Sequence, residues 1–374
     1  MATASSHAAV HALLRGPGWS SDQRHAAAVP DIAGEMLSKV LLFMDAPDHG
    51  RVRGLITKAF NPRTVEQLRP RIAEVTEVLL APLREAGRFD VIADFAFPLP
   101  VTVICELLGV PADDRALFRR LTADMAAVVD LDATPEEFGR AAGAMLTFTA
   151  YLVPLFEERR RSPRADLVSG LVAAEDAGDR LDAAELLTTV VLLLVAGHET
   201  TTNLIGNGLL ALLRHPEQLA RLRADPALMP SAVEELLRYD SPLRRIVRTA
   251  LDDTIVDGRP VRAGEQVVAL LHAANHDPAV FPAPDALDLT RDARRHVAFG
   301  GGVHACLGAG LARAEAQIAL AALVALPGLE LASVAEPAWR PLETLHALES
   351  LPVTCTPNLG DLVRSPSVGA APAD

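Results

Sequence analysis

Residues 299–308 of this chain read Phe-Gly-Gly-Gly-Val-His-Ala-Cys-Leu-Gly and deliver one cysteine, Cys306, behind a run of glycines. Successive glycines let a backbone bend sharply and come close to a flat ligand, without side chains in the way. Residues 307–326 are rich in Ala and Leu and are followed by Pro327-Gly328, which predicts a helix that begins beside Cys306. A helix N-terminus stabilises negative charge, so the pKa of the thiol is expected to be lowered and the sulfur to be a good metal ligand.

A second group of reactive side chains lies in residues 195–201, Val-Ala-Gly-His-Glu-Thr-Thr, at the end of a long apolar stretch. Ala196 and Thr200 are four apart and share a helix face, where a small residue beside a hydroxyl leaves room for a diatomic ligand. Thr200 can donate a hydrogen bond to that ligand, and Glu199 can help to supply protons. The alternative is a hydroxyl that bonds back to the preceding helical turn.

Two further pairs have spacings that suit charge recognition. His49 and Arg53 are four apart on an expected helix and could together hold a carboxylate, although a solvated basic face has the same pattern. Glu235 and Arg238 are three apart, so they can pair with each other and with groups near Cys306. Such pairs on a surface usually contribute little.

The elements that position these residues are mostly helical. Apolar residues recur at three- and four-residue spacing in residues 64–88, 113–131, 135–161, 182–214, 216–223 and 230–239. Strand patterns are few and occur late, at residues 246–256, 266–270 and 345–355. The predicted fold class is therefore mainly α with small β-sheets.

Length and composition favour one large domain. The chain has 374 residues, of which 50% are hydrophobic, and neither a linker nor an internal repeat divides it. We expect one domain over residues 1–356 and a flexible tail over residues 357–374, where little can be buried. The formal charge of −13 argues against binding to nucleic acid or to anionic lipid.

Cysteine usage and the N-terminus favour a cytoplasmic location. No two of the three cysteines have a short spacing, so neither a zinc cluster nor a disulfide framework is expected. Residues 1–14 lack the basic start and apolar run of a signal peptide or membrane anchor. The longest apolar segment, residues 186–197, is too short to span a bilayer and is expected to be a core helix.

The loop at residues 299–308 fills every fixed position of Phe-Gly-x-Gly-x-His-x-Cys-x-Gly and resembles the haem-binding loop of the cytochrome P450 family of haem-thiolate monooxygenases. Residues 195–201 resemble the oxygen-activating helix of that family, and residues 235–238 its Glu-x-x-Arg element. The resemblance covers roughly residues 19–355 and implies the cytochrome P450 fold. We expect this chain to lack the additional helix and the sheet-forming hairpin that family members usually carry before the region that starts here near Ala8.

The resemblance implies haem b as cofactor, with the Cys306 thiolate as the proximal ligand of the iron. It implies that Glu199 and Thr200 direct protons toward dioxygen. The residues that it places at the cofactor are His49, Arg53, Ala196, Gly197, Arg248, Phe299, Gly300, His304, Cys306 and Gly308.

The resemblance also assigns a structural role and a substrate pocket. Glu235 and Arg238 would brace the core on the haem side, with Arg291 in place of an arginine that the family often has soon after a Pro-Asp step. Independently of the resemblance, the Arg244-Arg245 pair is unusual in this stretch, and a buried guanidinium needs a partner. The hypothesis is that one of the two recognises a carboxylate or phosphate of the substrate, and the alternative is that both reach solvent or a haem propionate. The pocket candidates are Leu193, Val195, Leu243, Arg244, Arg245 and Ile246.

The implied reaction inserts one atom of dioxygen into a small organic substrate and reduces the other to water. The chain contains no recognisable flavin or iron–sulfur module, so a ferredoxin and its reductase are the expected electron donors. They would dock near Arg53, Lys58, Arg63 and Arg294. The alternatives are a catalytically silent haem protein, a module that binds a carrier protein, a haem sensor ligated by His304 or another histidine, and a peroxide-driven oxygenase.

Overall fold

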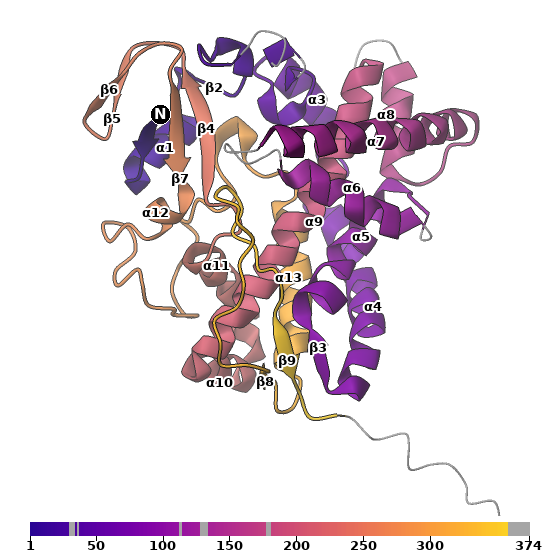
Figure 1. The fold of residues 1–374 in the computed structure, drawn as a ribbon, viewed down its shortest axis with the longest axis vertical. Helices are drawn as coiled ribbons and strands as arrows, with labels where there is room; N and C mark the ends of the chain where they lie inside the picture. Colours follow the sequence, from indigo (N-terminus) through magenta and orange to yellow (C-terminus); the bar gives the residue numbers. More distant parts are fainter. Residues whose placement is uncertain (30–33, 36, 112–113, 128–133, 177–180, 358–374) are drawn as a thin grey trace, which may run out of the picture.

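The computed structural model describes residues 1–29, 34–35, 37–111, 114–127, 134–176 and 181–357. The expected flexible tail lies outside the described residues, except for Pro357, as does the end of the helix predicted at 113–131. Helices dominate, as the sequence predicts, and Figure 1 shows α9 and α13 side by side at the centre of the molecule. The helices are α1 His7–Arg15, α3 Asp48–Thr57, α4 Pro62–Ala86, α5 Pro98–Leu108, α6 Arg115–Ala127, α7 Pro135–Arg161, α8 Leu167–Asp176, α9 Ala183–Arg214, α10 Pro216–Ala224, α11 Met229–Tyr239, α12 Leu271–Asn275 and α13 Ala309–Val324.

Across the described residues, the strands form two small sheets and one hairpin, which agrees with the predicted class. The four-stranded sheet has the order β1-β7-β4-β2, and the three-stranded sheet the order β3-β9-β8. β5 and β6 pair with each other alone, at the upper left of Figure 1. The strands are β1 Ala2–Ala4, β2 Trp19–Ser20, β3 Arg88–Asp90, β4 Arg245–Ala250, β5 Thr254–Val256, β6 Arg259–Val261, β7 Gln266–Leu270, β8 Glu330–Leu331 and β9 Pro352–Thr354.

α9 is the helix on which α5, α6, α7, α8, α10, α11 and α13 pack. It begins at a capping box, in which Asp182 and Glu185 satisfy each other's backbone N–H groups, and it ends before Pro216, which cannot continue a helix. Its first half lies in an apolar cluster with α3, α5, α7 and α8, and its second half in a cluster with α4, α11 and α13. A third cluster lies between α1 and the four-stranded sheet.

Several elements differ from the sequence prediction. The predicted strand at 246–256 is two strands, β4 and β5, with a break at residues 251–253. β5 pairs with β6 in a separate hairpin that turns at Asp257 and Gly258. Of the predicted strand at 345–355, only β9 is extended and paired as a strand. No sequence pattern predicted β1, α1, α5, α8 or the π-helical turn at Val91–Ala96. α5 is buried on nearly all sides, so it has no polar face to give it a helical period.

Two described segments are long and apolar enough to cross a membrane by composition, Val91–Leu108 and Ala183–Arg214. Within this fold, 67% of the first window and 44% of the second are buried. Both segments pack inside the helical core, where apolar helices of this length are expected as well.

Candidate functional site

Cys306 lies in the loop between a short 3-10 turn at Gly302–His304 and helix α13. The Cys306 N–H donates to the Phe299 carbonyl at 2.9 Å, which closes the loop. Phe299 in turn packs against the main helical core, and its ring lies 4.5 Å below the Arg313 guanidinium. These contacts fix the backbone that presents the sulfur.

The electrostatics at the sulfur differ from the sequence prediction. α13 begins at Ala309, so Cys306 lies just before the helix and not in its first turn. Burial raises the pKa of the Cys306 thiol, and hydrogen bonds from the Gly308 and Ala309 N–H groups offset only part of this effect. The prediction that the pKa of the Cys306 thiol is lowered is therefore wrong for the protein without a metal bound to the sulfur. The side chain remains accessible to solvent, but enough protein surrounds it for desolvation to be the largest effect.

The glycines of this loop are needed for its backbone and for its contact with α1. Gly300 and Gly302 have φ values of +66° and +64°, which favour glycine. A Cβ on Gly302 would lie 2.3 Å from the Leu14 carbonyl oxygen, and one on Gly301 would lie 3.1 Å from Arg15 Nε. The loop therefore packs directly on α1, a contact that the sequence analysis did not predict.

Four donors from three separate segments gather beside the loop. His49 and Arg53 come from α3, Arg248 from β4 and His304 from the loop itself. The His49 and His304 ring centroids are 4.2 Å apart, and Arg53 Nη2 donates to the Ala305 carbonyl at 2.6 Å. The structure thus brings together four of the residues that the resemblance placed at the cofactor.

Burial controls the charge of this donor cluster. Desolvation, followed by the Arg248 charge, lowers the pKa of His304 to about 3, and desolvation followed by the Arg53 charge lowers that of His49. Arg248 is 8% exposed as a residue, and its Nη1 donates to the carbonyl of the preceding Val247. Both histidines are therefore neutral at pH 7, while the two arginines carry charge.

The chemistry of this donor set fits a haem. Within the described part of the chain, the acidic group that acts on the two histidines is Asp45, which already accepts hydrogen bonds from Ser20 and Ser21. His49 Nε2 is buried and has no hydrogen-bond partner among the described residues. The cluster thus combines two arginines and two imidazoles with one carboxylate. It retains positive charge and unused hydrogen-bond donors, which suit the binding of two propionates. Cys306 beside them supplies a thiolate for the iron.

On α9, the structure places Ala196 and Thr200 on the accessible side of the helix and buries Glu199. The Thr200 hydroxyl donates to the Ala196 carbonyl at 3.0 Å, which is the back-bond weighed as an alternative, so its oxygen remains an acceptor. Gly197 has a packing reason to be small, because a Cβ there would lie 3.2 Å from Ile104 of α5.

Glu199 has a partner that the sequence did not indicate. Arg340 Nη1 lies 2.9 Å from Glu199 Oε2, although the two residues are 141 positions apart. Arg340 belongs to the segment that follows β8, where the sequence analysis expected only a later strand. No local pattern could have shown this pair, because it depends on how that segment returns to α9.

The candidates for the substrate pocket lie in two regions. Leu193 and Val195 pack against the same apolar cluster as Leu307, the residue after Cys306. Leu243 and Ile246 pack against the cluster at the four-stranded sheet. A cavity of about 730 Å³ between α3, α4, α5 and α8 contains none of the predicted catalytic or cofactor residues.

Arg244 and Arg245 differ in their surroundings. Arg245 Nη1 is 2.5 Å from Glu343 Oε2, and its Nε donates to Thr344 Oγ1 at 3.2 Å. Arg244 approaches Asp240 at 3.8 Å, and its Nε is buried without a partner among the described residues. Of the two arginines, Arg244 is therefore the better placed to take a further acidic partner.

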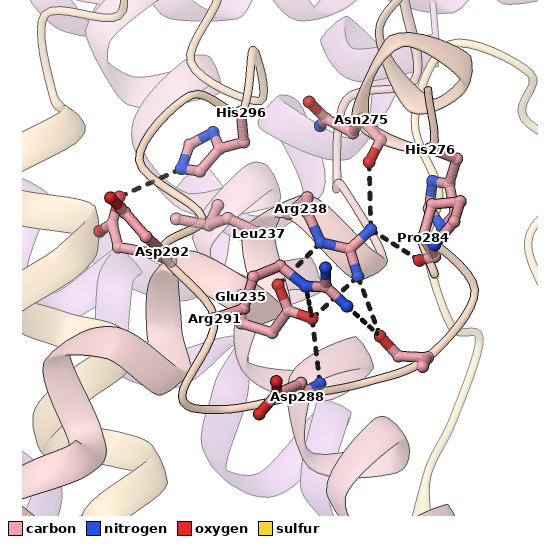
Figure 2. Close-up of polar contacts among 12 residues, drawn as sticks. Glu235, Leu237, Arg238, Asn275, His276, Pro284, Asp288, Arg291, Asp292 and His296 are labelled. Atoms are coloured by element: carbon pink, nitrogen blue, oxygen red, sulfur yellow. Dashed lines mark hydrogen bonds and ion pairs between the residues drawn. The ribbon is translucent and has the colours of Figure 1, made fainter. Parts of the chain in front are cut away.

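Figure 2 shows the buried network around Glu235 and Arg238. Both side chains are fully buried, and they pair through two hydrogen bonds of 2.7 and 2.8 Å. Arg291 Nε lies 3.1 Å from Glu235 Oε1. Arg291 therefore takes the place expected for the arginine that the family often has soon after the Pro-Asp step. Arg238 also donates to the carbonyls of Asn275 and Pro284, so the network ties α11 to the segment that leads to the Cys306 loop.

A second link between α11 and the loop was missed. Glu234 accepts hydrogen bonds from Arg313 of α13 at 2.6 and 2.9 Å and contacts His296 at 3.1 Å. Burial raises the pKa of Glu234, but the bonds from Arg313 and His296 bring it down to about 2. Glu234 and Glu235 are adjacent in the sequence, but the sequence does not show that Glu234 pairs with Arg313, because the two residues are brought together only by the fold.

The comparisons with known proteins agree with this geometry. The family model of cytochrome P450 matches residues 1–331. The chain is 45% identical to cytochrome P450 CYP107DY1 of Priestia megaterium, over 84% of this chain and 76% of that protein. It is 42% identical to the cytochrome P450 monooxygenase PikC of Streptomyces venezuelae, over 91% of this chain and 82% of that protein.

A solved structure, P450BioI in complex with an acyl carrier protein that carries hexadec-9Z-enoic acid, has a TM-score of 0.88 and 39% identity. It covers 94% of this chain and 91% of that one. The family of these relatives carries a protoporphyrin IX haem ligated by cysteine. The chain belongs to the cytochrome P450 family and is a haem-dependent monooxygenase.

Proposed function

We propose that this monooxygenase oxidises a small organic substrate in specialised metabolism, with Cys306 as the thiolate ligand of its haem. The overall reaction takes a C–H bond, dioxygen, two electrons and two protons, and it yields a C–OH group and water. The bound haem supplies the oxygen-activating chemistry, and the protein supplies binding, orientation and protons. The observation that carries the proposal is the placement of Cys306 beside the donor cluster of His49, Arg53, Arg248 and His304.

In this proposal, the two arginines and two histidines of the donor cluster hold the haem propionates. Glu199 and Thr200 provide the path for protons, since Thr200 lies on the accessible side of α9 and Glu199 is next to it. Glu235, Arg238 and Arg291 keep the backbone around the loop in place. We further propose that residues 1–356 act as one unit, because the three apolar clusters of the described residues adjoin the elements that carry these residues. A cytoplasmic location is proposed from the cysteine usage, since three cysteines without a short spacing fit a reducing compartment.

The substrate class is inferred from the relatives and from the pocket candidates. Relatives include a vitamin D(3) 25-hydroxylase and a nocardicin C N-oxygenase, and similar solved structures contain myristic acid or testosterone. The candidates Leu193, Val195, Leu243 and Ile246 are apolar, which suits a largely apolar molecule. Arg244 would bind an acidic group if the substrate has one. A library screen for compounds that shift the spin state of the haem would identify such molecules.

The electrons are proposed to come from a ferredoxin and its reductase. Lys58 and Arg63 are exposed, and Arg294 is 81% exposed next to Asp292. An acidic partner could approach these side chains even though the whole chain has a net charge of −13. Consumption of NADH that depends on substrate, with a surrogate ferredoxin system, separates this proposal from a catalytically silent haem protein.

The test of the thiolate is C306S, with C355S as the matched control at a buried cysteine elsewhere. The reduced carbon monoxide complex of the parent and of C355S should show the Soret band of thiolate ligation, and both should form product. C306S should lose that band and the product. An imidazole-type Soret band that is the same in the parent and in C306S would contradict the proposal and would favour a histidine ligand. A thiolate band that persists in C306S would also contradict it, because another cysteine would then be the ligand.

A further inference from the structure

We propose that Arg340 is a positioning residue that holds the Glu199 carboxylate and so controls the delivery of protons beside Thr200. The proposal rests on the proposed role of Glu199 and Thr200 in supplying protons. Arg340 lies in residues 338–349, which we call the C-terminal ribbon. Its Nη1 is 2.9 Å from Glu199 Oε2.

The Glu199 carboxylate depends on Arg340 because its surroundings offer little else. Its side chain is 6% exposed, so water cannot replace a lost partner easily. Among the described residues, the other titratable side chain in contact with Glu199 is His198, whose Nε2 lies 3.8 Å from Glu199 Oε1. His198 Nδ1 lies 2.6 Å from the Leu194 carbonyl oxygen and must donate to it, and burial lowers the pKa of His198. Nε2 of the neutral ring therefore carries no proton, and His198 cannot donate to Glu199.

Arg340 is itself held by the backbone of the C-terminal ribbon. Its N–H donates to the Ala347 carbonyl at 2.9 Å, and Trp339 pairs with Leu348. Asn207 of α9 donates to the His346 carbonyl at 2.9 Å, which fixes the ribbon to the same helix that carries Glu199. The guanidinium is thus presented to Glu199 from a backbone attached at both sides, and not from a free loop.

The tip of the C-terminal ribbon also contacts the predicted substrate pocket. Arg244 N–H donates to the Thr344 carbonyl at 2.9 Å, and Arg245 pairs with Glu343. A substrate that moves Arg244 or Arg245 therefore acts on the element that carries Arg340. This connection gives substrate binding a physical route to the proton-supplying pair.

The chemistry predicts what is lost without Arg340. Dioxygen, two electrons and two protons give hydrogen peroxide when no oxygen atom enters the substrate. The same inputs with substrate give the oxidised product and water. A Glu199 side chain without its guanidinium loses its fixed position, so a larger share of electrons should end in peroxide.

The experiment compares R340M, R340K and E199Q in the haem-loaded enzyme, with a surrogate ferredoxin system and a substrate found by the spin-state screen. We expect R340M to lower kcat about tenfold with little change in KM, because the substitution impairs proton delivery and not substrate binding. Product per NADH should fall and peroxide should rise, and R340K should recover part of both. R214M is the matched control, because Arg214 pairs with Glu336 between α9 and the same C-terminal segment but lies at the far end of the helix. It should behave like the parent.

A second readout does not depend on activity. Urea unfolding of the parent, R340M, E199Q and the double variant forms a double-mutant cycle. We expect R340M/E199Q to unfold at a higher urea concentration than additive effects predict, because the second substitution removes the carboxylate that the first left unpaired. If R340M keeps the parent's product yield while E199Q loses it, Arg340 has no positioning role and the proton-supply proposal stands. If E199Q also keeps that yield, the assignment of Glu199 itself is wrong.

Discussion

Buried carboxylates show how strongly single residues here depend on their partners. Glu199, Glu234 and Glu235 each face an arginine. Glu315 of α13 is also buried, but its Oε2 has no partner among the described residues. Burial raises the pKa of Glu315 to about 8, so this side chain is mostly protonated at pH 7. The same residue type is thus charged or neutral according to what the fold places next to it.

At the residue scale, we expect E315Q to change the pH dependence of stability. The folded protein keeps the Glu315 proton up to about pH 8, whereas the unfolded chain loses it near pH 4.5, so the parent loses stability as pH rises between these values. Relative to E315Q, the parent should lose about 3 kcal/mol of unfolding free energy between pH 5 and pH 8. Urea unfolding at both pH values measures this, with E85Q as an exposed control. A difference that does not change with pH would show that Glu315 is charged when folded.

At the scale of elements, the structure holds the Cys306 loop from three sides. α11 reaches the loop through Glu234 and through the network of Glu235 and Arg238, while α1 packs against its glycines. α3 reaches it through Arg53. Each link joins elements that are far apart in the sequence, so the loop is rigid only when the whole helical core is assembled.

We expect E235Q to destabilise the protein by roughly 3–5 kcal/mol, because it leaves the fully buried Arg238 without its charged partner. The matched control is E157Q in α7, which breaks a Glu/Arg pair at the same spacing whose carboxylate side chain is 56% exposed. That change should cost less than about 1 kcal/mol. Urea unfolding measures both variants. Equal effects would mean that burial of the pair does not contribute.

We also expect G302A to disturb the loop more than its backbone conformation alone explains. Its Cβ would contact the Leu14 carbonyl oxygen at 2.3 Å, in addition to the strain of φ +64°. G258A is the control, since Gly258 has a φ of +78° but open space around a Cβ, and it should cost only about 1–2 kcal/mol. G302A should lose haem on purification and unfold at lower urea concentration. Full haem content in G302A would show that α1 moves aside.

At the scale of the whole molecule, charge is distributed unevenly. The chain has a formal charge of −13, yet Lys58 and Arg63 lie exposed at the end of α3 and the start of α4, after Arg53. Attraction between such a group and an acidic partner accelerates association and weakens with salt. The overall charge therefore does not exclude an acidic electron donor.

We expect K58E/R63E to raise the KM for ferredoxin and to reduce the salt dependence of turnover, without changing reduction by dithionite. R259E, on the β5–β6 hairpin, makes a charge reversal on another exposed surface and should leave the KM for ferredoxin unchanged. Turnover at increasing salt measures the effect. If K58E/R63E and R259E have the same KM for ferredoxin, the docking surface lies elsewhere.

The sequence by itself determined the features that are local. The Cys306 loop, the helix of Ala196 and Thr200, and the Glu235 and Arg238 pair are short motifs, so spacing alone reveals which side chains share a loop or a helix face. The long amphipathic helices were also predicted within a few residues, because their apolar period is local. Elements without such a period, such as α5 and the three-residue strand β1, were not.

Only the tertiary structure decided which distant residues meet. Arg340 reaches Glu199 and Arg313 reaches Glu234 through chain reversals that no spacing encodes. The pKa of Cys306 was predicted in the wrong direction, because the sequence shows the nearby helix but not the depth of burial. The physical reason is the same in each case: desolvation and long-range ion pairing depend on the packing of the whole core, which the order of residues along one helix does not contain.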